Sequence, residues 1–172
     1  TPALAVDILD ALASAGYTPS VVVTVPDRPQ GRGMEMHESP VAVWAREHSI
    51  ECLKPEKLTP ECIAEFATHG IALGIVVAYG KILPQALLDV APMYNIHYSL
   101  LPRWRGATPV ESPILAGDAE TGVAIQKIVY DLDAGPLVAV EKTLIGKDET
   151  GLDVRVRLNA IAKELLVNIM PT

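Results

Sequence analysis

Two segments of the sequence carry the side chains best suited to chemistry: residues 95–109 (NIHYSLLPRWRGATP) and residues 132–136 (LDAGP). Asn95 and His97 are two residues apart, so at the end of a strand their side chains point to the same side of the sheet. Asp133 follows at a separation that could hold one helix and one strand. An amide, an imidazole and a carboxylate suit acyl transfer through a tetrahedral intermediate, because they can stabilise an oxyanion, move a proton and support the proton carrier. One nearby histidine without a cysteine does not resemble a metal site, so we expect no metal.

The composition limits the class of protein. The chain has 172 residues, of which 49% are apolar and 20% charged, which is typical of one globular domain. Its formal net charge of −7 argues against a nucleic-acid-binding surface over the whole chain, so such a partner would require a local basic patch or a second domain. Cys52 and Cys62 form no CxxC motif, which fits a reducing cytoplasm. The sequence contains no signal peptide and no apolar run long enough to cross a bilayer.

The elements that must position these residues alternate between helix and strand. Hydrophobic periodicity and capping residues predict helices over residues 1–15, 41–48, 59–67, 84–90, 110–116 and from 150 onward. Apolar, β-branched runs predict strands over residues 21–25, 51–53, 71–77, 94–97, 123–129 and 137–144, the last two as an antiparallel pair and 71–77 as a central parallel strand. The segment 26–40, rich in Pro, Gly and charge, reads as a long loop. The pattern predicts an α/β fold, with a Rossmann-like open, mostly parallel sheet and helices on both faces.

Ligands in such sheets bind outside the carboxyl ends of the strands. His97 lies at one such end, and Tyr79 and Gly80 follow another. Two strand ends that face one crevice favour a binding site more strongly than either motif alone.

At these residues the sequence resembles the catalytic core of the folate-dependent formyltransferases. The resemblance rests on NIHYSLLPRWRGATP, AGDAETGV and LDAGP, and it extends over almost the entire chain through SPVAVWA, VVAYGKILP and the DETG that leads the final helix. The loop PDRPQGRG at 26–33, together with RWRGA at 103–107, is most similar to the formyltransferases that act on methionyl-tRNA.

The resemblance implies a reaction and its residues. Asn95, His97 and Asp133 match the catalytic three, which would transfer the formyl group of 10-formyltetrahydrofolate to the α-amine of methionine on initiator tRNA. Asn95 would donate a hydrogen bond to the formyl oxygen, His97 would donate to the oxyanion and help move the amine proton, and Asp133 would orient His97 or a water and favour its imidazolium form. The residues implied for folate binding are Tyr79, Gly80, Ile82, Leu83, Ser99, Leu100, Leu101 and Pro102. Those implied for contacts with the tRNA are Arg28, Arg32, Arg103 and Arg105.

Other interpretations remain open for several of these residues. Asp131 is the rival carboxylate, although only Asp133 matches the D-x-G-P motif. The four arginines could be solvated charges, and Trp104 could be a core anchor as readily as a stacking surface.

Three departures from the family pattern bear on the assignment. The family has a strand before the opening helix and a C-terminal tRNA-binding domain, and this chain, which lacks an initiating methionine, has neither. We therefore expect residues 1–172 to be a formyltransferase catalytic domain clipped at its N-terminus. The segment 34–36 (MEM) is also less basic than a loop that grips tRNA should be.

The alternatives are a formyltransferase for a sugar amine or glycinamide ribonucleotide, a formyl-folate hydrolase, and a folate-binding module without turnover. We expect a monomer in the cytoplasm that binds folate and tRNA and no membrane.

Overall fold

The computed structural model describes residues 3–30 and 34–170. They form two compact units. Unit 1 contains the residues up to Ala72 together with Ala78–Ala91, and unit 2 contains Leu73–Val77 together with the residues from Pro92 onward.

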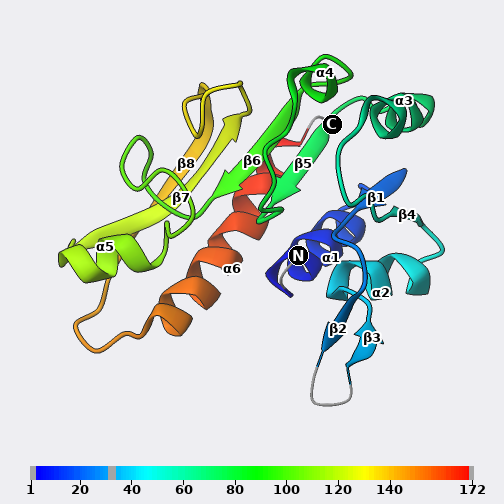
Figure 1. Ribbon diagram of the computed structural model, residues 1–172. Coiled ribbons are helices and arrows are strands. Elements are labelled where there is room, and N and C mark those ends of the chain that lie inside the picture. Colours follow the sequence, from blue (N-terminus) through cyan, green and yellow to red (C-terminus); the bar gives the residue numbers. More distant parts are fainter. Residues whose placement is uncertain (1–2, 31–33, 171–172) are drawn as a thin grey trace. The chain divides into compact units, whose positions relative to one another are not determined.

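In its described residues, unit 1 contains a parallel pair of short strands, a β-hairpin and four helices (Figure 1). Its elements are α1 (Leu4–Ser14), β1 (Val21–Val23), β2 (Arg28–Gln30), β3 (Glu35–His37), α2 (Pro40–Glu47), β4 (Glu51–Leu53), α3 (Pro60–Thr68) and α4 (Gln85–Leu88). Helix α2 packs on α1, β1 and β4. Helix α3 begins after Thr59 as predicted, and α2 begins one residue before the predicted range. Ser39 and Thr59 each accept a hydrogen bond from the first turn, and a proline follows each of them.

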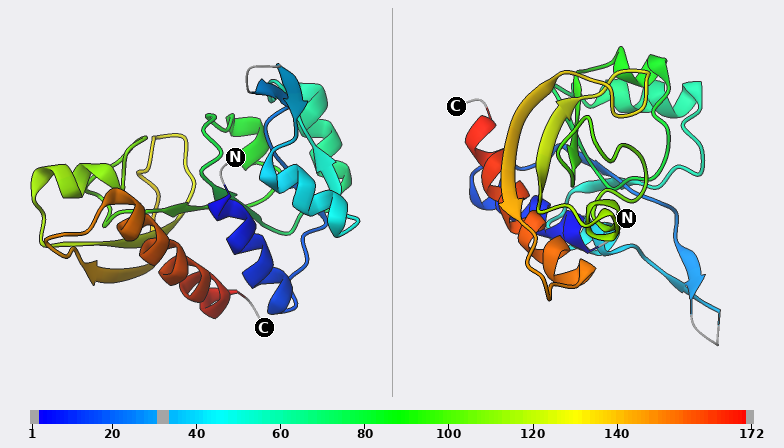
Figure 2. Two further views of the ribbon diagram at one scale, coloured as in Figure 1. Left: turned by 90° about the horizontal axis from the view of Figure 1, so that it is seen from below. Right: turned by 90° about the vertical axis from the view of Figure 1, so that its left-hand side faces the viewer.

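The segment expected to be a long loop contains a β-hairpin instead. Strands β2 and β3 pair antiparallel, with Arg28 opposite His37 and Gln30 opposite Glu35. The hairpin extends outward from the rest of unit 1 in Figure 1 and in the right-hand view of Figure 2. The sequence concealed it because both strands are only three residues long and exposed where they are described, and because Pro29 in the middle of β2 argues against a strand.

Unit 2 is a four-stranded sheet with one long helix packed against it. Its elements are β5 (Gly74–Val77), β6 (Met93–His97), α5 (Glu111–Ala116), β7 (Glu120–Lys127), β8 (Leu137–Leu144) and α6 (Gly151–Ile169). The strand order is β5-β6-β7-β8, parallel for the first pair and antiparallel for the other two. Helix α6 packs on β7 and β8, as the right-hand view of Figure 2 also shows.

Helix α6 follows from its sequence. Thr150 and Asp153 form a capping box that satisfies the first backbone N–H groups. Val154, Leu158, Ala162 and Leu166 recur every four residues and are buried, so one face of the helix packs against the sheet.

The predicted α/β fold is confirmed, and so is the antiparallel pair, although its first strand spans 120–127 and not the expected 123–129. The sheet differs in detail from a mostly parallel one, because two of its three pairings in unit 2 are antiparallel. Strand β5, expected to be central, is the end strand of this sheet. Its parallel partner β6 is the strand that carries Asn95 and His97.

Candidate active site

The end of β6 and the facing part of β7 form one polar face in unit 2. Asn95 and His97 alternate with Ile96 on β6, so both lie on the same face of the sheet. Gln126 stands directly opposite Asn95 on β7, and Ala124 stands opposite His97. A small alanine opposite the imidazole leaves room for the ring beside the strand.

His97 is held by the backbone of the turn that follows it. Its side chain is 4% exposed, and Nε2 lies 2.9 Å from the carbonyl oxygen of Trp104. A carbonyl oxygen only accepts, so Nε2 carries a proton and donates it there. Nδ1 makes no contact with that carbonyl, and it lies 3.8 Å from Oδ2 of Asp133. That distance is too long for a direct hydrogen bond but short enough for Asp133 to stabilise an imidazolium.

The carboxylate of Asp133 is held by neutral donors. Its Oδ2 accepts from the backbone N–H of Gly106 at 2.8 Å, and its Oδ1 accepts from the amide of Gln126 at 2.9 Å. The side chain is 10% exposed. Neither donor carries a charge, so these two bonds hold the carboxylate of Asp133 in position without neutralising it.

The rest of the LDAGP motif explains why Asp133 is where it is. Asp133 has a left-handed backbone (φ 47°). A Cβ on Gly135 would lie 1.7 Å from the carbonyl oxygen of Lys127, so only glycine allows this close approach. Lys127 in turn donates its backbone N–H to the carbonyl of Pro136. Asp131, the rival carboxylate, is exposed. Asp133 is therefore the carboxylate that approaches His97.

The turn after β6 is closed by its own side chains. Ser99 is fully buried, and its hydroxyl donates to the carbonyl of Arg103 at 2.8 Å. This bond holds the turn in the shape that presents the Trp104 carbonyl to His97. Of the other turn residues proposed for folate contact, Leu101 is buried, Leu100 is half-buried and Pro102 is exposed.

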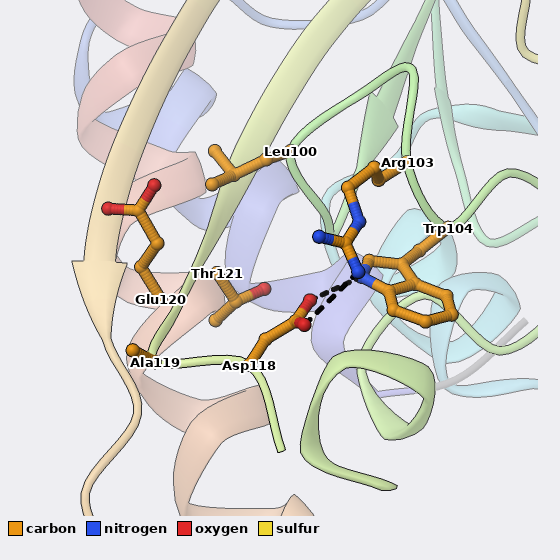
Figure 3. A pocket seen from close by; sticks show the side chains of 7 residues that line it. All are labelled: Leu100, Arg103, Trp104, Asp118, Ala119, Glu120 and Thr121. Carbon is orange, nitrogen blue, oxygen red and sulfur yellow. Dashed lines mark hydrogen bonds and ion pairs between the residues drawn. The ribbon is translucent and has the colours of Figure 1, made fainter. Parts of the chain in front are cut away.

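A hollow of about 170 Å³ lies beside this turn (Figure 3). Its lining residues are Leu100, Arg103, Trp104, Asp118, Ala119, Glu120 and Thr121. Asp118 accepts from Arg103 at 3.1 Å and from the indole N–H of Trp104 at 2.8 Å. The guanidinium of Arg103 also lies over the indole ring, 4.9 Å from its centroid. Arg103 and Trp104 thus have a structural function at this turn, whereas Arg105 is exposed.

The folate-binding residues expected after β5 lie in unit 1. Tyr79 is half-buried, and within the described part of the chain its hydroxyl has no hydrogen-bond partner. Burial raises the pKa of this hydroxyl, and the nearby Cys62 adds to the effect. Gly80 has a left-handed backbone, Ile82 is 82% exposed and Leu83 is half-buried. The segment therefore offers both an exposed apolar side chain and an unsatisfied polar group.

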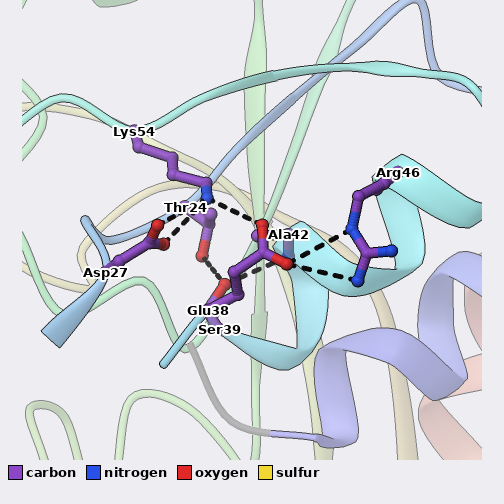
Figure 4. Close-up of polar contacts among 7 residues, drawn as sticks. All are labelled: Thr24, Asp27, Glu38, Ser39, Ala42, Arg46 and Lys54. Atoms are coloured by element: carbon purple, nitrogen blue, oxygen red, sulfur yellow. Dashed lines mark hydrogen bonds and ion pairs between the residues drawn. The ribbon is translucent and has the colours of Figure 1, made fainter. Parts of the chain in front are cut away.

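Unit 1 also contains an ion cluster that the sequence analysis missed (Figure 4). The ammonium of Lys54 lies 2.8 Å from a carboxylate oxygen of Asp27 and 3.0 Å from one of Glu38. The hydrogen bond to Asp27 raises the pKa of Lys54, and the bond from Lys54 lowers the pKa of Glu38. Asp27 precedes β2 and Glu38 follows β3, so Lys54 ties together the two ends of the hairpin. No short motif signals this cluster, because its three residues meet only after the hairpin has formed.

Three residues remain to be placed: two arginines that the sequence predicted for tRNA contact, and Gln126, which it did not predict. Arg28 lies on β2 and is exposed, whereas Arg32 lies outside the described residues. Gln126 was not predicted, although its position opposite Asn95 could have been found once the strand register was known.

A search of the described ranges finds no group of three or more His, Cys, Asp and Glu side chains that could hold a metal ion. No helix in those ranges is long and apolar enough to cross a membrane.

The fold has counterparts among known structures. The fold matches phosphoribosylglycinamide formyltransferase from Bacillus halodurans, with a TM-score of 0.80 and 22% identity over 95% of this chain and 86% of that one. It also matches a sugar N-formyltransferase from a Shewanella species, with a TM-score of 0.73 and 17% identity over 98% of this chain and 64% of that one. At these identities the likeness shows the fold alone.

Sequence comparison defines the family. The family model described as "Formyl transferase" matches residues 1–170, and the chain belongs to this family, as the sequence motifs indicated. A methionyl-tRNA formyltransferase from Dinoroseobacter shibae is 45% identical over 99% of this chain and 58% of its own length. One from a Synechococcus strain is 43% identical over 99% of this chain and 52% of its own length. The chain thus spans just over half the length of these relatives.

Proposed function

We propose that the protein transfers the formyl group of 10-formyltetrahydrofolate to the α-amine of initiator methionyl-tRNA. The observation that carries this proposal is the 43–45% identity, over nearly the whole chain, to relatives named methionyl-tRNA formyltransferase. The buried polar face of unit 2 supports the chemical half of the proposal, and the exposed Arg28 supports the acceptor half.

Each of the three proposed catalytic residues has a role that follows from its chemistry. The amine nitrogen forms a bond to the formyl carbon, and Asn95 donates a hydrogen bond to the oxygen that becomes negative; one such donor is worth roughly 10²–10³ in rate. Nδ1 of His97 takes the amine proton, because Nε2 is committed to the Trp104 carbonyl. Asp133 stabilises the imidazolium so formed. The proton then passes to the folate nitrogen as its bond to the formyl carbon breaks.

Folate binding is assigned to two segments. Tyr79, Gly80, Ile82 and Leu83 offer an apolar surface and an unsatisfied hydroxyl, and the backbone of 99–102 offers donors and acceptors to the amide-like edge of the pterin. The buried hydroxyl of Ser99 acts through the shape of the turn, since it already bonds the Arg103 carbonyl.

The tRNA contacts are assigned to arginines. Arg28 and Arg105 are exposed and can pair with phosphates, which makes binding salt-dependent. Arg103 is shared with Asp118 and contributes less. Arg32 belongs to the same proposed set by its place in the PDRPQGRG loop. We further propose that the protein acts as a cytoplasmic monomer.

The decisive experiment supplies 10-formyltetrahydrofolate and compares charged initiator tRNA with a sugar amine, glycinamide ribonucleotide and water as acceptors. We expect formyl-methionyl-tRNA as the main product. Faster transfer to one of the other acceptors would show that the protein acts on that acceptor and not on methionyl-tRNA. Folate binding without any turnover would show that the protein is a binding module and not an enzyme.

The assignment of the site residues has its own test. His97→Ala and Asp133→Asn should each lower kcat by about 10²–10⁴ while folate binding persists. Asp131→Asn is the matched control, because Asp131 is an exposed aspartate two residues away, and it should keep its rate within about twofold. Near-native rates in the His97 and Asp133 variants would show that other residues carry the reaction.

A further inference from the structure

Gln126 is a buried polar side chain to which the reaction assigns no role. It is 2% exposed and lies on β7, in the middle of the sheet of unit 2. Its amide lies 2.9 Å from Oδ1 of Asp133, and a carboxylate can only accept, so the nitrogen end of the amide faces Asp133. The orientation of the amide is therefore fixed by chemistry.

The other end of the same amide is unsatisfied. Within the described residues, Oε1 of Gln126 is buried without a hydrogen-bond partner. A buried acceptor without a partner destabilises the fold, so it is retained only where something compensates for it. The register places Asn95 directly opposite Gln126, on the same face of the sheet. Side chains at such opposed positions lie close enough to bond, since their Cβ atoms are about 4.5–5.5 Å apart.

We propose that Gln126 is a positioning residue of the formyl-transfer site that links Asp133 to Asn95. Its N–H holds the carboxylate of Asp133 beside His97. Its Oε1 accepts one N–H of Asn95 when the formyl donor is bound, which aims the second N–H of Asn95 at the formyl oxygen. This inference rests on the proposed function for its rate effects, but the link to Asp133 also has a test that needs no substrate.

Gln126→Met removes both hydrogen bonds and keeps a side chain of similar length. We expect kcat to fall about 10- to 100-fold, as misplacement of catalytic groups does, while KM for 10-formyltetrahydrofolate changes less than about threefold. Thr121→Val is the matched control, because Thr121 lies on the same strand, is 1% exposed and also has a hydroxyl without a partner in the described residues. Its rate should stay within about twofold of native. An unchanged kcat in Gln126→Met would overturn the proposal.

Gln126→Glu separates positioning from packing, because it keeps the shape and replaces the donor. At low pH the new carboxyl and Asp133 share one proton, which preserves the donor to Asp133. As the pH rises that proton is lost and the two carboxylates repel each other. The rate of Gln126→Glu relative to native should therefore fall with rising pH. A ratio that does not depend on pH would assign Gln126 to packing alone.

The substrate-free test is the NMR titration of the His97 ring. Gln126→Met releases Asp133 and weakens its stabilisation of the imidazolium, so the midpoint of the titration should move to lower pH. An unchanged midpoint in a folded variant would overturn the link to Asp133, even if the protein proved to have another acceptor or no turnover.

The link to Asn95 is tested by a double-mutant cycle. Asn95→Ala should lower the rate less in the Gln126→Met background than in the native protein, because Asn95 is already misaligned there. Equal losses in both backgrounds would overturn this half of the proposal.

Discussion

Two clusters of hydrogen bonds around carboxylates, one in each unit, differ in whether the hydrogen-bond donors are charged or neutral. In unit 1, Asp27 and Glu38 bind the ammonium of Lys54 directly. In unit 2, Asp133 binds a backbone N–H and the amide of Gln126, both neutral. Both clusters follow strand ends, and both fix their carboxylates with several hydrogen bonds.

The difference distinguishes carboxylates paired with a cation from one that is free to act on a developing charge, as proposed for Asp133. A carboxylate bonded to a fixed cation is already neutralised, so it has little charge to offer a transition state. Asp133 is oriented without being neutralised, so its charge acts on whatever positive charge forms nearby. The ring of His97, with Nδ1 3.8 Å from Oδ2 of Asp133, is placed to use it. Neutral donors around a buried carboxylate therefore indicate function more clearly than the carboxylate itself does.

Gly135→Ala should break the unit 2 cluster and leave the unit 1 cluster intact. The new methyl group would overlap the Lys127 carbonyl, so the strand or the LDAGP turn must move. We expect a loss of about 1–3 kcal/mol in the free energy of unfolding together with a lower kcat. Urea denaturation and single-turnover kinetics measure the two effects.

Gly151→Ala is the control for this glycine. Its added methyl would meet only Ile114, at 4.0 Å, at the start of α6. It should be neutral or slightly stabilising. A stable, fully active Gly135→Ala protein would show that the turn does not hold Asp133 in place.

Lys54→Met should break the unit 1 cluster and leave the chemistry intact. Among the described residues, it leaves Asp27 without its cation and Glu38 paired with Arg46 alone, so the base of the hairpin loosens. We expect the thermal midpoint to fall by about 2–4 °C, with kcat within about twofold of native. Differential scanning calorimetry measures the shift, and Lys57→Met, at an exposed lysine of the same loop, should change it by less than about 1 °C. A large loss of kcat would mean that the two clusters are functionally coupled.

The sequence singled out the proposed catalytic residues of the Asp133 cluster, and their role stays a prediction, whereas it gave no sign of the Lys54 cluster. Asn95, His97 and Asp133 lie in short motifs whose residue types indicate acyl-transfer chemistry. Asp27, Glu38 and Lys54 carry no such signal, because their meeting depends on a hairpin of exposed strands that apolar alternation does not reveal.

Gln126 is a buried residue next to the candidate site that the sequence did not predict. Its strand was predicted from its apolar run, but which face a residue takes depends on strand register. The antiparallel register of β6 and β7 sets Gln126 opposite Asn95, and that register is known only from the folded sheet. Gln126 and Asn95 lie on different strands, so neither strand sequence on its own predicts that they are opposite each other.

The smallest expected effect is a pH dependence confined to the unit 1 cluster. The pKa of Glu38 is lowered in the folded protein, mainly by its hydrogen bond from Lys54. A lowered pKa contributes stability that is present above the unfolded value, roughly 4.3, and is lost as the pH falls through the folded value below it. The stability difference between the native protein and Glu38→Gln should therefore be constant near neutral pH and shrink on acidification below about pH 4.3. Because Glu38 is solvent-accessible, 1 M salt should also reduce the difference. Urea titrations at several pH values measure it, and an equal difference at pH 3 and pH 7 would show that Lys54 does not neutralise Glu38.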